Sequence, residues 1–182
     1  MNTILQQELK KILNGRFSQS ESTRLNYSRG EDTYDPILSK AVVFPETNEE
    51  VSKILKLCNE HKVPVVPFGT GTSLEGNVVG NDKGITISLE KMNKILSVNT
   101  QDFDCRVQAC VTREQLNDYL REDGVFFPID PGANAAIGGM ASTSASGTMA
   151  VKYGTMKTVI TGLTVVLPNG EIMNTGGRTK KT

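Results

Sequence analysis

Hydrophobic positions in the first part of the chain follow helical and strand spacing in turn. Leu5, Leu9, Ile12 and Leu13 recur every three or four residues, which predicts an amphipathic helix over residues 5–13. Thr47, with Glu50 three residues later, has the pattern of a capping box and predicts a second helix. Residues 17–36 are rich in Ser, Asn, Gly and Asp and predict a loop. The other expected elements are strands over 41–44, 63–67, 84–89, 95–98, 105–111 and 159–167 and a helix from 112 or 113 to 124. Pro168-Asn169-Gly170 predicts a turn, followed by a hairpin partner over 171–174.

The order of these elements predicts an α+β fold, because helices and strands alternate at first and strands dominate later. The 182 residues suffice for one compact domain with a core, and 37% hydrophobic with 22% charged residues excludes a disordered chain. Twenty basic residues balance twenty acidic ones, which removes the electrostatic argument for a nucleic-acid partner. No apolar run is long enough for a transmembrane segment, and the amino terminus lacks the core of a signal peptide, so we expect a cytoplasmic protein.

The sequence offers little material for a metal site. His61 is the single histidine, and the three cysteines form no CxxC pair, so we expect reduced, buried thiols and no metal. We identify no catalytic residue in this chain. Candidate chemistry instead lies in two stretches that are rich in glycine and small polar residues.

The first of these stretches follows the strand predicted over 63–67. Glycines at alternate positions can adopt positive φ and direct successive N–H groups at one anion, and hydroxyl and amide side chains add donors. The spacing GxGxxxxG fits neither a P-loop nor a Rossmann turn. We interpret this turn as a binding site for a phosphate or diphosphate, with a plain surface turn as the alternative. Its candidate residues are Pro67, Gly69, Thr70, Gly71, Thr72, Ser73, Gly76 and Asn77.

The second stretch, residues 131–147, has almost only small side chains. Small residues let the backbone approach a flat ligand, and their hydroxyls offer hydrogen bonds. A flexible linker is the alternative, although Ile137 and Met140 interrupt the small residues. Together the two stretches suggest one long, phosphate-containing ligand held by backbone at two places.

Three segments carry a resemblance to a known family. They read ETNEEVSKILKLCNEHKVPVVPFGTGTSLEG, FFPIDPGANAAIGGMASTSASGTMAVKYGTM and VVLPNGEI. They resemble the PCMH-type FAD-binding domain of the vanillyl-alcohol oxidase and p-cresol methylhydroxylase superfamily, in the branch of the glycolate oxidase subunit and cytochrome-type D-lactate dehydrogenases. The resemblance implies two α+β subdomains, the second incomplete at the carboxyl end. It divides the chain into an amino-terminal helix and loop, 1–35, and a truncated FAD-binding domain, 36–182, without the family's cap domain.

The resemblance also implies FAD as the cofactor and assigns residues to its parts. The first stretch would hold the diphosphate. Where some relatives carry a histidine that bonds covalently to the flavin, this chain has Thr72, so we expect non-covalent FAD. Residues Pro131, Gly132, Gly138, Gly139, Ser142 and Ser146 would line the ribityl chain and isoalloxazine. Residues Tyr153, Gly154, Val159 and Ile160 would approach the adenine side.

The function implied by this resemblance is the FAD-binding portion of a dehydrogenase that transfers hydride from a D-2-hydroxy acid, D-lactate or glycolate, to flavin N5. The family's substrate-binding and catalytic residues lie beyond the matched segments, so we expect the isolated chain to be inactive. A non-catalytic truncated or split fragment that needs a partner chain, and a phosphate-binding module unrelated to flavin, are the alternatives. A membrane-peripheral location through an electron-acceptor partner is compatible with this function.

Overall fold

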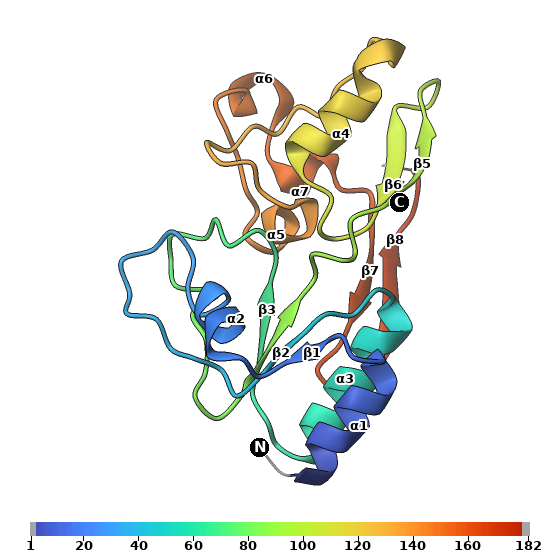
Figure 1. Ribbon diagram of the computed structural model, residues 1–182. Coiled ribbons are helices and arrows are strands. Elements are labelled where there is room, and N and C mark those ends of the chain that lie inside the picture. Colours follow the sequence, from blue (N-terminus) through green and yellow to red (C-terminus); the bar gives the residue numbers. More distant parts are fainter. Residues whose placement is uncertain (1–2, 180–182) are drawn as a thin grey trace. The chain divides into compact units, whose positions relative to one another are not determined.

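The computed structural model describes residues Thr3–Thr179 and has the mixed helix and strand order of an α+β protein (Figure 1). The helices are α1 (Thr3–Leu13), α2 (Glu21–Asn26), α3 (Asn48–Glu60), α4 (Arg113–Leu120), α5 (Ile137–Ser142), α6 (Ala150–Tyr153) and α7 (Met156–Val159), with a 3-10 turn, η1 (Arg121–Asp123). The strands are β1 (Phe17–Ser18), β2 (Val42–Val43), β3 (Val65–Phe68), β4 (Ile85–Ser88), β5 (Ile95–Asn99), β6 (Asp104–Val107), β7 (Gly162–Val166) and β8 (Ile172–Gly176).

The chain divides into two compact units, which are described separately below. Unit 1 comprises the residues up to Lys91 together with Thr164–Met173. Unit 2 comprises Met92–Leu163 and the residues from Asn174 onward. None of the helices formed by residues 3–179 has the length and apolar character that a membrane span requires.

Unit 1 is built on a four-stranded sheet with strand order β1-β2-β4-β3. Strands β2 and β3 both run parallel to β4, and β1 pairs with β2 in the antiparallel sense. Helix α3 connects β2 to β3, as a crossover between parallel strands requires. Because Phe68 pairs with Ser88, β3 and β4 end at the same edge of the sheet.

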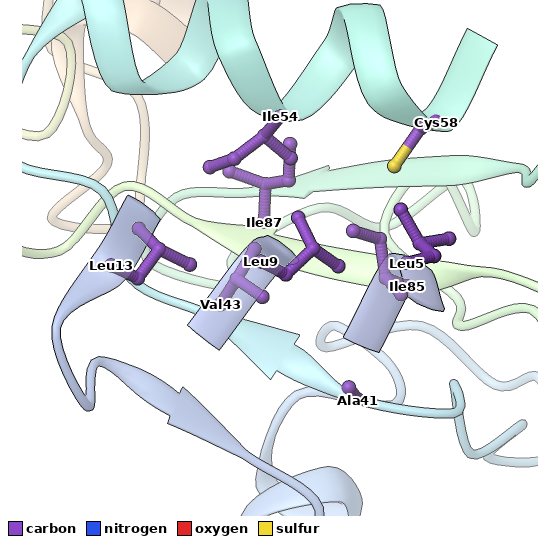
Figure 2. Packing of buried hydrophobic residues seen from close by; sticks show 9 residues of the cluster. All are labelled: Leu5, Leu9, Leu13, Ala41, Val43, Ile54, Cys58, Ile85 and Ile87. Carbon is purple, nitrogen blue, oxygen red and sulfur yellow. The ribbon is translucent and has the colours of Figure 1, made fainter. Parts of the chain in front are cut away.

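The core of unit 1 lies between this sheet and helices α1 and α3 (Figure 2). Leu5, Leu9 and Leu13 recur every four residues of α1, so they form one buried stripe. Ile54 and Cys58 have the same spacing on α3. Figure 2 shows these side chains meeting those of β2 and β4. Desolvation raises the pKa of the Cys58 thiol to about 12, so it remains protonated at neutral pH.

The opposite face of β4 is polar although it is buried. Ile85 and Ile87 face the helices, whereas Thr86 and Ser88 alternate with them. The Thr86 hydroxyl donates to the Ser39 hydroxyl (2.8 Å), which also accepts from the Asn81 amide (3.1 Å). This network satisfies polar groups that would otherwise destabilise the interior.

An ion pair joins the segment after α1 to the start of α3. The Arg16 guanidinium donates to both carboxylate oxygens of Glu50, at 2.7 and 2.5 Å, and to the Phe44 carbonyl at 3.0 Å. The hydrogen bond from Arg16 lowers the pKa of Glu50 below its usual 4.5. Thr47 caps α3 as predicted, since its hydroxyl accepts from the Glu50 amide (3.2 Å). The Glu50 side chain reaches back to the Glu46 amide, one residue before the cap.

Unit 2 contains the antiparallel hairpin of β5 and β6, with an irregularity in register between Ile95 and Ser97. Helix α4 begins where the sequence predicts, and the Thr112 hydroxyl caps it by accepting from the Gln115 amide (3.2 Å). It continues through η1 and ends at Gly124, whose φ of 69° is left-handed. Val111, Leu116 and Leu120 form the buried centre of this part.

The hairpin of β7 and β8 is divided between the units, with its turn and the adjoining strand residues, Thr164–Met173, in unit 1 and the rest of both strands in unit 2. Gly170 in the predicted Pro-Asn-Gly turn is buried and has φ +86°. Its carbonyl accepts a hydrogen bond from the Ser52 hydroxyl of α3. The left-handed conformation and this close approach to α3 explain why glycine is needed at the turn.

Three expectations from the sequence are wrong in part. Residues 17–36 are not only a loop, because they contain β1 and α2; α2 buries none of its residues and therefore lacks an apolar pattern. Residues 159–167 do not form one strand, since Val159 ends α7 and β7 begins at Gly162. Met156 explains the difference, because burial of its side chain and the bond from its amide to the Ala145 carbonyl (2.9 Å) favour a helical turn over β propensity. Finally, Cys105 is exposed rather than buried.

Candidate functional site

The first glycine-rich stretch leaves the carboxyl end of a parallel strand in unit 1. Pro67 is the third residue of β3, and Gly69 follows its last residue, Phe68. The neighbouring strand β4 ends beside it at Ser88. In sheets of parallel strands, ligands bind beyond the carboxyl ends of the strands. The position of the loop therefore suits a binding site.

Two glycines in this loop need their left-handed conformation. Gly71 has φ +75° and Gly76 has φ +71°. A Cβ at Gly71 would lie 2.8 Å from the Phe68 ring, so the loop backbone rests directly on this aromatic side chain. The Phe68 ring in turn meets Tyr27 edge-on, with centroids 5.0 Å apart, and the Tyr27 hydroxyl donates to the Glu90 carboxylate. The Phe68 and Tyr27 rings thus pack against the side of the turn where Gly71 lies.

The exposed side of the loop carries hydrogen-bond donors. The hydroxyl oxygens of Thr70 and Thr72 lie 3.4 Å apart, and the side chains of Thr70 and Asn77 are exposed. Within residues 3–179, the backbone amides of Thr72, Ser73 and Leu74 donate no hydrogen bond. Amides without a protein acceptor, next to hydroxyl groups and two left-handed glycines, are what an anion-binding turn requires. This arrangement supports the anion-site interpretation over a plain surface turn.

The second stretch is folded in unit 2, so the linker interpretation is wrong. It contains α5, and Met140 of this helix is 1% exposed. Met140 forms one buried cluster with Ile129 and Met156. Small side chains here accompany a packed structure rather than a flexible one, and Pro131 and Gly132 lead into it.

The three candidate glycines of this stretch, Gly132, Gly138 and Gly139, differ in their surroundings. A Cβ at Gly138 would lie 2.7 Å from the Ala109 Cβ and 2.9 Å from the Ala109 carbonyl oxygen, so packing within the protein explains this glycine. A Cβ at Gly132 or Gly139 would meet no atom within 4 Å. Both have exposed backbone outside the left-handed region, so neither protein packing nor conformation explains them. Gly139 lies inside α5, where glycine costs about 1 kcal/mol relative to alanine.

Hydroxyl groups after Gly139 are only partly available to a ligand. The Ser142 hydroxyl donates to the Gly138 carbonyl (2.9 Å), which leaves it an acceptor rather than a donor. Ser146 is exposed and follows α5.

Asp130 holds the end of this stretch, a role that sequence reasoning missed. Its carboxylate accepts from the Thr148 hydroxyl (2.5 Å) and the Met149 amide (3.0 Å). These two hydrogen bonds, the Thr148 one first, lower the pKa of Asp130. The sequence shows Asp130 before a Pro-Gly pair, which signals a turn, but not the partners nearly twenty residues later.

The last four candidate residues lie around α6 and α7. Tyr153 ends α6, and its ring meets Phe126 edge-on with centroids 5.6 Å apart. Gly154 follows with φ +82°. Val159 and Ile160, expected in a strand, instead end a helix and pack against the cluster of Ile129, Met140 and Met156. Their side chains are partly buried and therefore contribute to the core.

A further segment missed from the sequence, residues 28–34, lies against the first loop. A Cβ at Gly30 would lie 2.6 Å from the Ser73 carbonyl oxygen, and a Cβ at Gly76 would lie 2.8 Å from the Tyr34 ring. The nearly buried Asp32 carboxylate accepts from the amides of Gly30 and Tyr34, both at 3.1 Å.

Among residues 3–179, no group of three or more His, Cys, Asp or Glu side chains is arranged to hold a metal ion.

Comparisons with known proteins agree with this geometry. Residues 39–176 match the FAD binding domain family. The chain is similar to a probable mitochondrial D-lactate dehydrogenase of Danio rerio (44% identity over 164 residues, 90% of this chain and 33% of that protein). It is also similar to the mitochondrial D-lactate dehydrogenase [cytochrome] of Arabidopsis thaliana (41% identity; 96% and 31%) and to the glycolate oxidase subunit GlcD of Bacillus subtilis (34%; 91% and 36%). The chain spans about one third of the length of these curated relatives.

Solved structures share the fold. The match to p-cresol methylhydroxylase has a TM-score of 0.79 at 25% identity and covers 98% of this chain and 36% of that one. An alkyldihydroxyacetonephosphate synthase matches with a TM-score of 0.87 at 23% identity, over 98% and 36%. The expected α+β fold of this superfamily is confirmed, while a cytoplasmic location stays a prediction, since two of the relatives are named as mitochondrial. The chain belongs to the FAD binding domain family, and FAD is the cofactor of that domain.

Proposed function

We propose that this chain is the FAD-binding portion of a flavin-dependent D-2-hydroxy acid dehydrogenase of the D-lactate or glycolate type. The support is its similarity to two D-lactate dehydrogenases and to a glycolate oxidase subunit over at least 90% of its own length. In this proposal, residues 36–182 form the flavin-binding domain and residues 1–35 precede it. The part of that range beyond Thr179 lies outside the described residues.

The first loop would hold the diphosphate of FAD. Its free amides at Thr72, Ser73 and Leu74 and the hydroxyls beside them are donors that suit phosphate oxygens. Gly69, Gly71 and Gly76 keep side chains away from the turn, and Pro67 and Asn77 flank it. Thr72 lacks the ring nitrogen through which histidine bonds to the flavin in some relatives, so the cofactor would be dissociable.

The second stretch would line the ribityl chain and ring system, and Gly139 is the observation that carries this assignment. The space where a Cβ at Gly139 would lie is open, and glycine at this helical position lowers the stability of the helix relative to alanine. A flat ligand against the exposed backbone of Gly139 and Gly132 explains both features. Pro131, Ser142 and Ser146 would border the same surface, and Gly138 would act through its packing on Ala109.

The late residues would approach the adenine side. Tyr153 offers an aromatic ring and Gly154 a left-handed backbone that packs on Thr158, whereas Val159 and Ile160 would contribute mainly main-chain contacts because their side chains pack in part on the core. When bound, FAD supplies the redox chemistry by accepting hydride at N5 from the α-carbon of the hydroxy acid. The residues of this chain position and hydrogen-bond the cofactor. We assign none of them to substrate binding or proton transfer, and the electron acceptor and any partner chain are likewise proposals.

An FAD titration of the purified chain tests this function. We expect FAD to bind, to quench its fluorescence, and to appear wholly in the supernatant after acid precipitation because it is not covalently attached. The chain should not reduce an artificial acceptor with D-lactate, since the relatives are about three times longer. Failure to bind FAD, or turnover of D-lactate by this chain alone, would contradict the corresponding part of the proposal.

Gly139→Ala gives the sharper version of the test, because its two effects have opposite signs. The substitution should raise stability by about 0.5–1 kcal/mol through helix propensity. It should also weaken FAD binding by filling the space for the ligand. Gly177→Ala is the matched control in unit 2, since a Cβ there also meets no atom within 4 Å. If the two variants bound FAD with equal affinity, Gly139 would not be part of the FAD-binding surface.

A further inference from the structure

Gly30 lies against the two carbonyl groups that alternate along the first loop. If Gly30 carried a Cβ, this atom would be 2.6 Å from the Ser73 oxygen and 2.9 Å from the Gly71 oxygen. These oxygens are the nearest atoms of both loop residues to that position. Gly30 has φ outside the left-handed region, so the close approach, not the conformation, explains the glycine. Both carbonyls therefore face the segment around Gly30.

The direction of these carbonyls determines where the next amides point. The described chain has no cis peptide bonds, and in a trans peptide the C=O of one residue and the N–H of the next point in opposite directions. With the Gly71 and Ser73 oxygens turned toward Gly30, the N–H groups of Thr72 and Leu74 point away from it. Neither of these amides donates a hydrogen bond within residues 3–179. Two donors are thus presented together on one side of the loop.

Contacts on either side of Gly30 keep its segment against the loop. Asp32 is 9% exposed, and its carboxylate joins the amides of Gly30 and Tyr34. The Ser28 carbonyl accepts from the amide of Gly80, which follows the loop (2.8 Å). The Tyr34 ring covers Gly76. The segment is therefore in contact with the loop, or with the residues just after it, before, at and after Gly30.

We propose that Gly30 is a positioning residue for anion binding. It orients the amides of Thr72 and Leu74 so that both can donate to a ligand with a diphosphate group. This assignment rests on the proposed function for its natural ligand, FAD, and adds two features to it. The Leu74 amide becomes a hydrogen-bond donor to the diphosphate. The apolar side chain of Leu74, which is 68% exposed, gives no indication of this role in the sequence. Gly30 becomes part of the support of the binding site, because it acts on the ligand through the loop.

Calorimetric titration with inorganic pyrophosphate and with FAD tests Gly30. We expect Gly30→Ala to weaken binding of both by about tenfold or more, because its Cβ displaces two carbonyls and with them two donors to a charged group. Thr33→Ala is the control in the same segment, since Thr33 is exposed, and its affinities should stay within about twofold of wild type. Equal binding by wild type and Gly30→Ala would overturn the inference.

A second pair of variants keeps the test decisive if Gly30→Ala does not fold. Leu74→Pro deletes the amide donor, whereas Leu74→Ala removes the side chain and keeps the amide. We expect a loss of about tenfold in pyrophosphate affinity for the proline variant alone. Equal affinities in the two variants would refute the role of the Leu74 amide.

Amide resonances provide a signature that a purely structural role of Gly30 would not produce. In 1H–15N spectra, pyrophosphate should shift the Thr72 and Leu74 amide protons downfield more than that of Ser73. A larger shift at Ser73, or none in the loop, would overturn the inference. If pyrophosphate binds in this way and FAD does not bind, the proposed function fails while the assignment of the loop stands. If neither binds, both fail.

Discussion

Replacing Ile54 provides a quantitative test of how unit 1 is held together. No part of this side chain is exposed, and it lies in the cluster that joins α3 to α1 and β4 (Figure 2). Ile54→Ala removes three carbon atoms, and at about 0.8 kcal/mol per buried methylene the transfer term is about 2.4 kcal/mol. The cavity left between a helix and a sheet adds to this, so we expect a total loss of about 3–4 kcal/mol.

Two further variants define the scale. Ile54→Val removes one carbon and should cost about 1 kcal/mol. Ile4→Ala removes the same atoms from a side chain that is 58% exposed on α1, and should change stability by no more than about 0.5 kcal/mol. The ordering of the three variants follows from burial, because the chemistry of the deletion is similar.

Urea unfolding followed by circular dichroism gives the free energies, and hydrogen exchange assigns them to unit 1. The second measurement is needed because two compact units can unfold in separate steps. Amides of α3 and β4 should lose protection in Ile54→Ala. If this variant lost less than about 1 kcal/mol, or no more than Ile54→Val, the described packing of α3 on the sheet would be wrong.

Two other predictions concern carboxylates. Because its pKa is lowered in the folded state, Glu50 stabilises the protein above its usual pKa of 4.5 and loses that contribution as pH falls through the lowered value. Glu50→Gln should therefore lower the urea midpoint at pH 7, and this midpoint should fall less steeply between about pH 5 and pH 3 than that of the wild type. Glu49→Gln, at an exposed position, should follow the wild type. A parallel fall of the midpoint in all three proteins would contradict the role of Glu50. Asp130→Ala should accelerate hydrogen exchange at the Met149 amide, because this amide loses its acceptor. Asp123→Ala in η1 is the control and should leave this exchange unchanged. Unchanged exchange at Met149 in Asp130→Ala would show that Asp130 does not hold the residues around Met149 in place.

Local sequence patterns were sufficient where the cause of a structure lies within a few residues. The leucine spacing of α1, the Thr47 cap and the Pro-Asn-Gly turn predicted elements that the structure contains. Each acts through neighbouring backbone groups or one helix face, so it can be read from order alone. The two glycine-rich stretches were found in the same way, because a shortage of side chains is visible in the sequence.

Long-range contacts decided the features that the patterns missed. The residues 158–160 favour a strand by composition, yet burial of Met156 and its bond to Ala145 produce the α7 turn. Helix α2 has a cap but buries nothing, so no periodicity revealed it. In α7 the stabilising contacts come from partners outside the segment, whereas α2 has only a local cap.

The sequence by itself predicted the class of the fold, seven of the eight strands and three of the seven α-helices among residues 3–179, and it located the two glycine-rich stretches that we propose as ligand-binding. Only the tertiary structure distinguished Gly138, which packs on Ala109, from Gly139, which faces open space, and brought Gly30 against Gly71 and Ser73. The reason is physical: a glycine's freedom is encoded in its residue type, but the atoms that would fill the place of its Cβ come from parts of the chain far away in sequence.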